Sequence, residues 1–285
     1  MFDHKAIQLV DCPRDAIQGI HDFISTDKKI KYINSLIKSG LFDCIDFGSF
    51  VSPKAVPQLS DTRSVLEGLN KDENVKLLAI IANYKGAEIA SELEKIDYLG
   101  YPFSISETFQ MKNTNSNIEQ AYTTVGDISN LLKQKGSQEL VVYISMAFGN
   151  PYGDTWSQEL VCDWINKLNE IGVENFSIAD TTSEARPDDV RDLFRLLHKE
   201  FPDIPFSAHL HSPIESALLK VDAAFEAGCR RFEGAILGFG GCPFAKDDLV
   251  GNIPSELLVD RFKKGTFNEV SVLMQGFQEM ISHGI

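Results

Sequence analysis

The sequence has few basic residues for its length and no basic cluster. Its 285 residues include 27 Lys and Arg against 41 Asp and Glu, which gives a formal net charge of −14. Proteins that bind nucleic acid usually carry a basic patch or stripe on one face. No run of Lys and Arg is long enough to form one, so we expect no nucleic-acid partner. The acidic excess mainly favours solubility.

Cysteine is also scarce. There are five cysteines, an odd number, and no two of them lie at CxxC spacing; they are Cys12, Cys44, Cys162, Cys229 and Cys242. This usage favours free thiols in a reducing compartment over a disulfide framework. All but Cys242 fall within predicted strands or helices, so we interpret those four as core residues.

Long apolar runs are absent as well. No stretch reaches the roughly 18 apolar residues that a membrane span requires. The first ten residues, MFDHKAIQLV, lack the basic region and long apolar stretch of a secretory signal. We therefore expect a soluble cytoplasmic protein without a membrane partner. Hydrophobic residues still make up 43% of the chain, which is enough for a large core.

What the sequence does contain is a regular alternation of two patterns. Short apolar or β-branched runs predict strands at residues 7–12, 44–49, 76–82, 98–103, 140–147, 175–180, 205–211 and 230–237. Segments with helical periodicity lie between them. In the segment 26–40, for example, Ile30, Ile33 and Leu36 share one face, and Gly40 is a typical helix stop.

About eight strand-then-helix units is the number found in a TIM (β/α)8 barrel. An open, doubly wound sheet is the structural alternative, but it usually carries a glycine-rich phosphate loop after its first strand. Here the first strand runs into CPRDAIQG, which lacks that pattern. We therefore predict one α/β domain over residues 1–285. It consists of a barrel at about 7–264 and an additional C-terminal helix at about 266–283.

His209 and His211 form the most informative motif, at the end of the predicted strand PFSAHLH. Side chains two residues apart on a strand point to the same side. Both imidazoles can therefore face one point, as two ligands of one metal ion would. A single histidine at a strand end is more often structural, whereas a His-x-His pair at the mouth of a barrel favours a metal site.

Active-site residues of a barrel come from the carboxyl ends of its strands and the loops that follow. The polar residues and the cysteine at these positions are Arg14, Asp15, Asp46, Ser49, Ser177, Asp180, His209, His211, Cys242 and Asn252. Several have ordinary alternatives. Asp15 could cap a helix and Asp180 could order its loop. Asn252 could be a turn residue, and Cys242 a small buried hydrophobe.

Five segments in collinear order connect these residues to a known family. The segments are PRDAIQ (13–18), SFVSPKAVPQLSD (49–61), SIADT (177–181), AHLH (208–211) and GFGGCPFAKDDLVGN (238–252). In them the chain resembles the 3-hydroxy-3-methylglutaryl-CoA lyases, a family of metallolyase TIM barrels. The resemblance extends from about residue 7 to about residue 260.

The resemblance implies a divalent cation, most simply Mg²⁺ or Mn²⁺, because two nitrogen and two oxygen ligands with open positions suit such ions. The implied ligands are Asp15, His209, His211 and Asn252. The implied reaction is retro-Claisen cleavage of 3-hydroxy-3-methylglutaryl-CoA to acetyl-CoA and acetoacetate. The implied partner is thus a small acyl-CoA substrate, and a homodimer is possible.

The resemblance also implies catalytic roles. Arg14 would hold and polarise the thioester oxygen. His209 or Asp46 would accept the hydroxyl proton, and Cys242 would lie on a loop over the substrate and assist proton transfer. The residues expected to contact substrate are Gln18, Ser49, Ser177 and Asp180.

The chain departs from the lyase pattern at several positions. Asp46 stands where the lyases usually have a glutamate on the second strand. Ser212 replaces the acidic residue that usually follows the second histidine, and Asn150 replaces a usual cysteine after the fifth strand. Metal-dependent carbon–carbon chemistry is thus better supported than one substrate. The alternatives are a related aldolase or Claisen-type synthase that acts on a 2-oxo acid or another hydroxyacyl-CoA, and a catalytically silent binding protein. The last would be marked by lost metal ligands, and none is lost.

Overall fold

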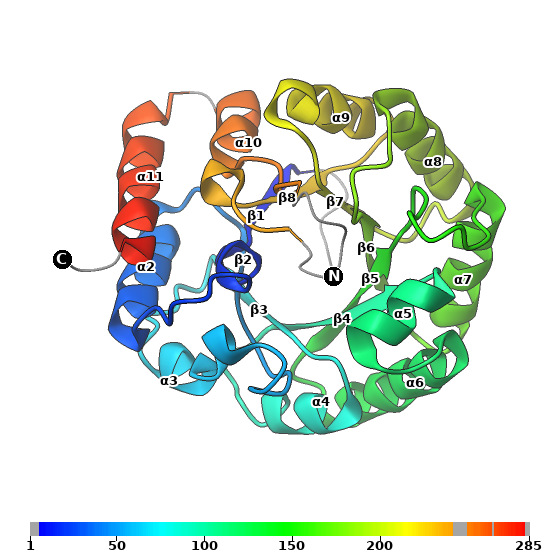
Figure 1. Cartoon of the computed structure of the whole chain (residues 1–285), viewed down its shortest axis with the longest axis horizontal. Helices are drawn as coiled ribbons and strands as arrows, with labels where there is room; N and C mark the ends of the chain where they lie inside the picture. Colours follow the sequence, from blue (N-terminus) through cyan, green and yellow to red (C-terminus); the bar gives the residue numbers. More distant parts are fainter. Residues whose placement is uncertain (1–5, 242–249, 264, 283–285) are drawn as a thin grey trace.

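Eight parallel strands close into a barrel in chain order, and β8 pairs back onto β1 (Figure 1). The computed structural model describes residues 6–241, 250–263 and 265–282. The strands are β1 (Gln8–Asp11), β2 (Cys44–Ser49), β3 (Lys76–Ile80), β4 (Tyr98–Ser104), β5 (Glu139–Ser145), β6 (Asn175–Asp180), β7 (Phe206–Leu210) and β8 (Arg231–Gly234). The predicted TIM barrel is confirmed, and each strand lies within three residues of its predicted bounds.

The helices lie mostly in an outer ring around this barrel, but the short helix α1, drawn in dark blue, lies inside that ring (Figure 1). They are α1 (Pro13–Ile17), α2 (Thr26–Ser39), α3 (Thr62–Glu67), α4 (Tyr84–Ala90), α5 (Glu107–Thr114), α6 (Ile118–Lys135), α7 (Gln158–Glu170), α8 (Pro187–Glu200), α9 (Ile214–Glu226), α10 (Ser255–Phe262) and α11 (Phe267–Ile281), with short 3₁₀ turns η1 (Pro57–Leu59) and η2 (Ile236–Gly238). None of the helices described here is both long and apolar enough to span a bilayer.

Strand side chains alternate between two apolar regions. Residues such as Leu9, Ile45 and Leu77 belong to the large core that includes the buried faces of the helices. A second, smaller cluster contains Val10 and Tyr143, together with the thiol of Cys44. Successive residues of a strand face opposite sides of the sheet. Polar strand residues that alternate with residues of the large core therefore point into the barrel.

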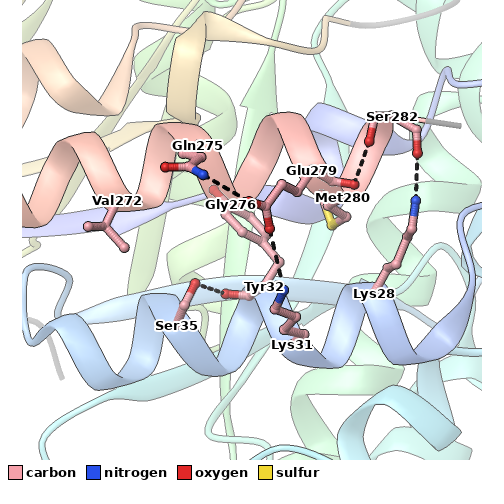
Figure 2. Close-up of a pocket in the computed structure, with 10 residues that line it drawn as sticks. All are labelled: Lys28, Lys31, Tyr32, Ser35, Val272, Gln275, Gly276, Glu279, Met280 and Ser282. Carbon is pink, nitrogen blue, oxygen red and sulfur yellow. Dashed lines mark hydrogen bonds and ion pairs between the residues drawn. The ribbon is translucent and has the colours of Figure 1, made fainter. Parts of the chain in front are cut away.

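The C-terminal helix α11 packs against α2 in the outer layer, which confirms the predicted additional helix (Figure 1). The ring of Tyr32 meets Phe277 edge-on at 5.5 Å. Figure 2 shows the groove between the two helices, a cavity of about 490 Å³. Lys28 donates to the backbone oxygen of Ser282 beyond the end of α11, where carbonyl groups lack helical partners. This groove therefore belongs to the docking of α11 and contains none of the predicted site residues.

Gly234 ends β8 in a position with no space for a side chain. A β-carbon there would lie 2.5 Å from the backbone oxygen of Ile253 and 2.9 Å from Cδ1 of Leu258. We expect Gly234→Ala to cost about 1–3 kcal/mol, because the backbone oxygen cannot move aside like a flexible side chain. Thermal unfolding without added metal would show a Tm several degrees lower. Gly19→Ala, with no atom within 4 Å of the new methyl group, is the control. Equal Tm values for the two variants would contradict this packing argument.

Candidate functional site

The predicted site residues come together at the carboxyl ends of the strands. Helix α1 begins directly after β1 with Pro13 at its first turn, and it places Arg14 and Asp15 in buried positions there. A proline is well tolerated at this position because its missing N–H would be unpaired in any case. His211 forms an isolated bridge with Asn252, and the Asn252 amide nitrogen donates to Oδ2 of Asp15 at 2.6 Å. Residues 237 positions apart in the sequence are thereby brought into contact.

The two imidazoles face each other through their Nε2 atoms, which lie 3.3 Å apart. Nδ1 of His209 lies 3.0 Å from a carboxylate oxygen of Glu233, and Nδ1 of His211 lies 3.1 Å from the backbone oxygen of Val250. Both of these oxygens can only accept hydrogen bonds, so each Nδ1 carries the proton of a neutral ring. In that tautomer each Nε2 is an acceptor, and a proton or a cation can lie between the two.

Asp15 completes a set of metal-ligating groups. Its carboxylate and the two histidine rings have ligand atoms that all lie within 4.8 Å of one another, and all three residues are buried. Burial would raise the pKa of Asp15, but Arg14 and the two histidines lower it below its ordinary value. Because the Asn252 nitrogen donates to Asp15, the amide oxygen is the atom that could bind a cation. Two ring nitrogens and two side-chain oxygens suit Mg²⁺, Mn²⁺ or a similar divalent ion.

The charges around the histidines also favour a cation. Buried carboxylates act on both rings: Glu233 and Asp15 on His209, and Asp15 and Asp180 on His211. Buried negative charge is costly unless an ion or a proton compensates it. The residues present thus fit a divalent cation in donor type, tautomer and charge.

Sequence reasoning missed Glu233, the carboxylate behind His209. Burial would raise its pKa, but the hydrogen bond and charge of His209, with help from Arg231 and Ser207, lower the pKa to about 2. Burial alone would lower the pKa of His209, but the hydrogen bond and charge of Glu233, with help from Asp15, raise it. The available signal was an acidic residue inside the apolar run RRFEGAIL, on the strand that neighbours both β7 and β1.

Arg14 is held by a network that engages most of its donors. Nε and Nη2 donate to the carboxylate of Asp46, at 3.0 and 2.6 Å to Oδ2. Nη1 donates to Asp15 at 3.1 Å and to Gln18 at 3.0 Å. A guanidinium group has five N–H bonds. Within the described part of the chain, one N–H on Nη2 is left for a ligand.

Asp46 lies beneath Arg14 and is fully buried. Burial raises the pKa of Asp46 to about 6 against the opposing effect of Arg14. The carboxylate is thus ionised at neutral pH, but it has a much higher proton affinity than an ordinary aspartate. Asp46 therefore combines two capacities, orienting the guanidinium and accepting a proton.

The residues predicted to contact substrate make hydrogen bonds within the protein. Gln18 bridges the network, accepting from Arg14 and donating to Asp15. The Ser49 hydroxyl donates to the backbone oxygen of Ile80, and the Ser177 hydroxyl donates to Glu233. Their contact with substrate stays a prediction. Cys242 lies outside the described residues.

Asp180 orders the loop after β6, as its ordinary alternative interpretation suggested. Its Oδ1 accepts from the backbone N–H groups of Glu184 and Ala185, and its Oδ2 lies 2.7 Å from Nζ of Lys220. The same Nζ donates to the backbone oxygen of His211 at 2.9 Å. This buried ion pair therefore fixes the end of β7 where the metal-ligating pair lies. Sequence reasoning assigned Lys220 no role.

Comparison with known proteins agrees with this arrangement. A family model described as HMGL-like matches residues 6–273. The chain is 32% identical to the mitochondrial hydroxymethylglutaryl-CoA lyase of Macaca fascicularis over 260 residues, covering 90% of this chain and 78% of that protein. It is also 32% identical to the lyase YngG of Bacillus subtilis over 247 residues, covering 87% of this chain and 81% of that protein.

A solved structure is similar over almost the whole chain. It is an HMG-CoA lyase from Acinetobacter baumannii in complex with coenzyme A and 3-methylmalate, with a TM-score of 0.89 and 30% identity. The similarity covers 99% of this chain and 93% of that one. The barrel, the site at its carboxyl end and the family match over residues 6–273 together lead to one conclusion: this chain belongs to the HMGL-like family.

Proposed function

We propose that this protein is a carbon–carbon lyase that cleaves 3-hydroxy-3-methylglutaryl-CoA to acetyl-CoA and acetoacetate with a divalent cation. The observation that carries the proposal is the convergence of His209, His211 and Asp15 beside the anchored guanidinium of Arg14. This places a cation-binding group next to a fixed donor for an oxyanion. Retro-Claisen cleavage needs both, because a hydroxyl must lose its proton while negative charge moves onto a thioester oxygen.

Asp15, His209, His211 and Asn252 would hold the cation, most simply Mg²⁺ or Mn²⁺. When bound, a divalent cation supplies Lewis acidity, which makes the tertiary hydroxyl of the substrate easier to deprotonate. The protein's part is to present two unprotonated Nε2 atoms and an ionised carboxylate in advance. The hydrogen bonds at both Nδ1 atoms support this role, because they favour a proton on Nδ1 and leave Nε2 unprotonated.

Arg14 would donate to the thioester oxygen through the remaining N–H of Nη2. Since Asp46, Asp15 and Gln18 already fix the guanidinium, little side-chain entropy is lost when the substrate binds. As the carbon–carbon bond breaks, its electron pair moves into the thioester and forms an enolate. The permanent charge of arginine stabilises that enolate oxygen without a proton transfer.

We assign the hydroxyl proton to Asp46 and the proton for the enolate carbon to Cys242. Nδ1 of His209 is bound to Glu233 and its Nε2 would be a ligand of the cation, so this ring would not serve as the base. Each oxygen of Asp46 keeps acceptor capacity beside Arg14. Protonation of the enolate carbon then releases acetyl-CoA, and the other fragment leaves as acetoacetate.

The acyl-CoA substrate class is supported by the structural relative, which was solved with coenzyme A. The second candidate is a related aldolase or Claisen-type synthase that acts on a 2-oxo acid or another hydroxyacyl-CoA. Asp46 supports this second candidate, because its side chain is one methylene shorter than the usual glutamate and places the carboxylate differently. The cytoplasmic location and the homodimer stay predictions from the sequence.

An assay with purified protein separates the two candidates. Acetoacetate should form from 3-hydroxy-3-methylglutaryl-CoA when Mg²⁺ or Mn²⁺ is added and should stop when a chelator removes the ion. The control is the same protein with a 2-oxo acid or a different hydroxyacyl-CoA as substrate. Failure to form acetoacetate at any concentration of either metal would end the lyase proposal.

The proposed ligands give a direct test of the cation site. We expect Asp15→Ala and His209→Ala each to weaken Mn²⁺ binding strongly and to abolish turnover, because each removes one donor atom. Isothermal titration with Mn²⁺ and the acetoacetate assay measure the two effects. Circular dichroism should show little loss of fold. Wild-type turnover in either variant would contradict the ligand assignment.

The raised pKa of Asp46 predicts a pH dependence. A base must be deprotonated to act, so kcat/KM should fall as pH drops through about 6 and reach a plateau above about 7. Asp46→Asn should lower kcat/KM and remove this acidic limb, because an amide does not titrate. Asp46→Glu is the matched control, since it keeps a titrating carboxylate. An unchanged limb in Asp46→Asn would assign it to another group.

A further inference from the structure

We propose that Glu233 is a positioning residue that fixes His209 in the tautomer and orientation needed to present Nε2 to a cation. The proposal rests on the metal site inferred above. Glu233 lies on β8, outside the group of proposed ligands, and is hydrogen-bonded to the imidazole of His209. Its role is therefore to act on a ligand, and it would contact neither the cation nor the substrate.

The contact itself has the geometry of a charge-assisted hydrogen bond. Oε2 of Glu233 lies 3.0 Å from Nδ1 of His209, and the exposed fraction of the glutamate is only 2%. A carboxylate accepts hydrogen bonds on either oxygen, so it holds the ring proton on Nδ1 and leaves Nε2 unprotonated. Carboxylates in this position also make the imidazole a stronger donor to metal ions.

Glu233 is itself anchored by side chains from two other strands. Its other oxygen, Oε1, accepts from the hydroxyls of Ser177 on β6 at 2.8 Å and Ser207 on β7 at 2.5 Å. The carboxylate is thus tied to three consecutive strands of the barrel. Tyr143 meets the His209 ring edge-on at 5.5 Å and restricts its rotation. The imidazole is held at its nitrogen and against its ring, as precise ligand placement requires.

The second histidine provides an internal comparison. Nδ1 of His211 donates to the backbone oxygen of Val250, a neutral acceptor, where His209 has a full negative charge. Charge-assisted hydrogen bonds are roughly twice as strong as neutral ones. The two rings are therefore unequal: His209 is the more firmly oriented ligand, and Glu233 is the cause of that difference.

The decisive experiment is a Mn²⁺ titration of the whole chain without substrate. Glu233→Gln keeps the size of the side chain but removes its charge and permits either ring tautomer. We expect its Kd for Mn²⁺, measured by electron paramagnetic resonance, to rise about 10–100-fold. Glu233→Asp keeps the charge and should give a Kd between those of wild type and Glu233→Gln. Glu139→Gln, the same change at the amino end of β5, is the matched control and should leave Kd unchanged.

Long-range ¹⁵N–¹H correlation spectra report which ring nitrogen of His209 carries the proton. If Glu233 only contributed to packing, its substitution would not change that tautomer. Without metal, His209 should show the Nδ1-protonated form in wild type and a tautomer mixture in Glu233→Gln. Wild-type Mn²⁺ affinity in both Glu233 variants, or an unchanged tautomer, would overturn the positioning role. Because these measurements contain no substrate, a failed lyase assay leaves them standing. If the wild-type chain itself bound no Mn²⁺, both this proposal and the metal site would fall.

Discussion

The site depends on two imidazole nitrogens that face each other across 3.3 Å. Their orientation is set from behind, by a carboxylate on His209 and a backbone oxygen on His211. A proton or a cation can lie between them. The strands, the bridge from His211 to Asn252 and the ion pair of Lys220 all maintain this arrangement. The fold therefore holds the two nitrogens close together, as one shared ligand would require.

Arg14 is the second constraint, because it joins the proposed cation ligand Asp15 to the buried carboxylate of Asp46. One guanidinium group links Asp46 on β2 with Asp15 and Gln18 on and beside α1. In a buried environment these interactions are stronger than in water, and an unpaired charge would be costly. In the proposed reaction, one network would couple substrate binding, polarisation and proton transfer, and the short helix α1 supplies two members of that network, Arg14 and Asp15.

The general architecture and most of the site residues could be predicted from local patterns. Eight apolar runs matched the eight strands, because burial on both faces leaves a continuous hydrophobic signal. The His-x-His spacing implied a shared direction for His209 and His211. By contrast, Glu233 and Lys220 looked like ordinary members of a strand and a helix. Glu233 contacts His209, 24 residues away in the sequence, and Lys220 contacts the backbone of His211, nine residues away. Hydrophobic periodicity does not encode such contacts.

The sequence by itself predicted the barrel and its C-terminal helix, which follow from hydrophobic period and turn residues, local properties of the chain. It also indicated a shared direction for the two histidines, and its resemblance to the lyases implied the full set of candidate cation ligands. Only the tertiary structure decided which nitrogen of each histidine is available, how many donors of Arg14 remain and why Asp46 holds its proton more tightly than usual. Those properties depend on burial and on contacts between distant segments, and closure of the barrel brings both about.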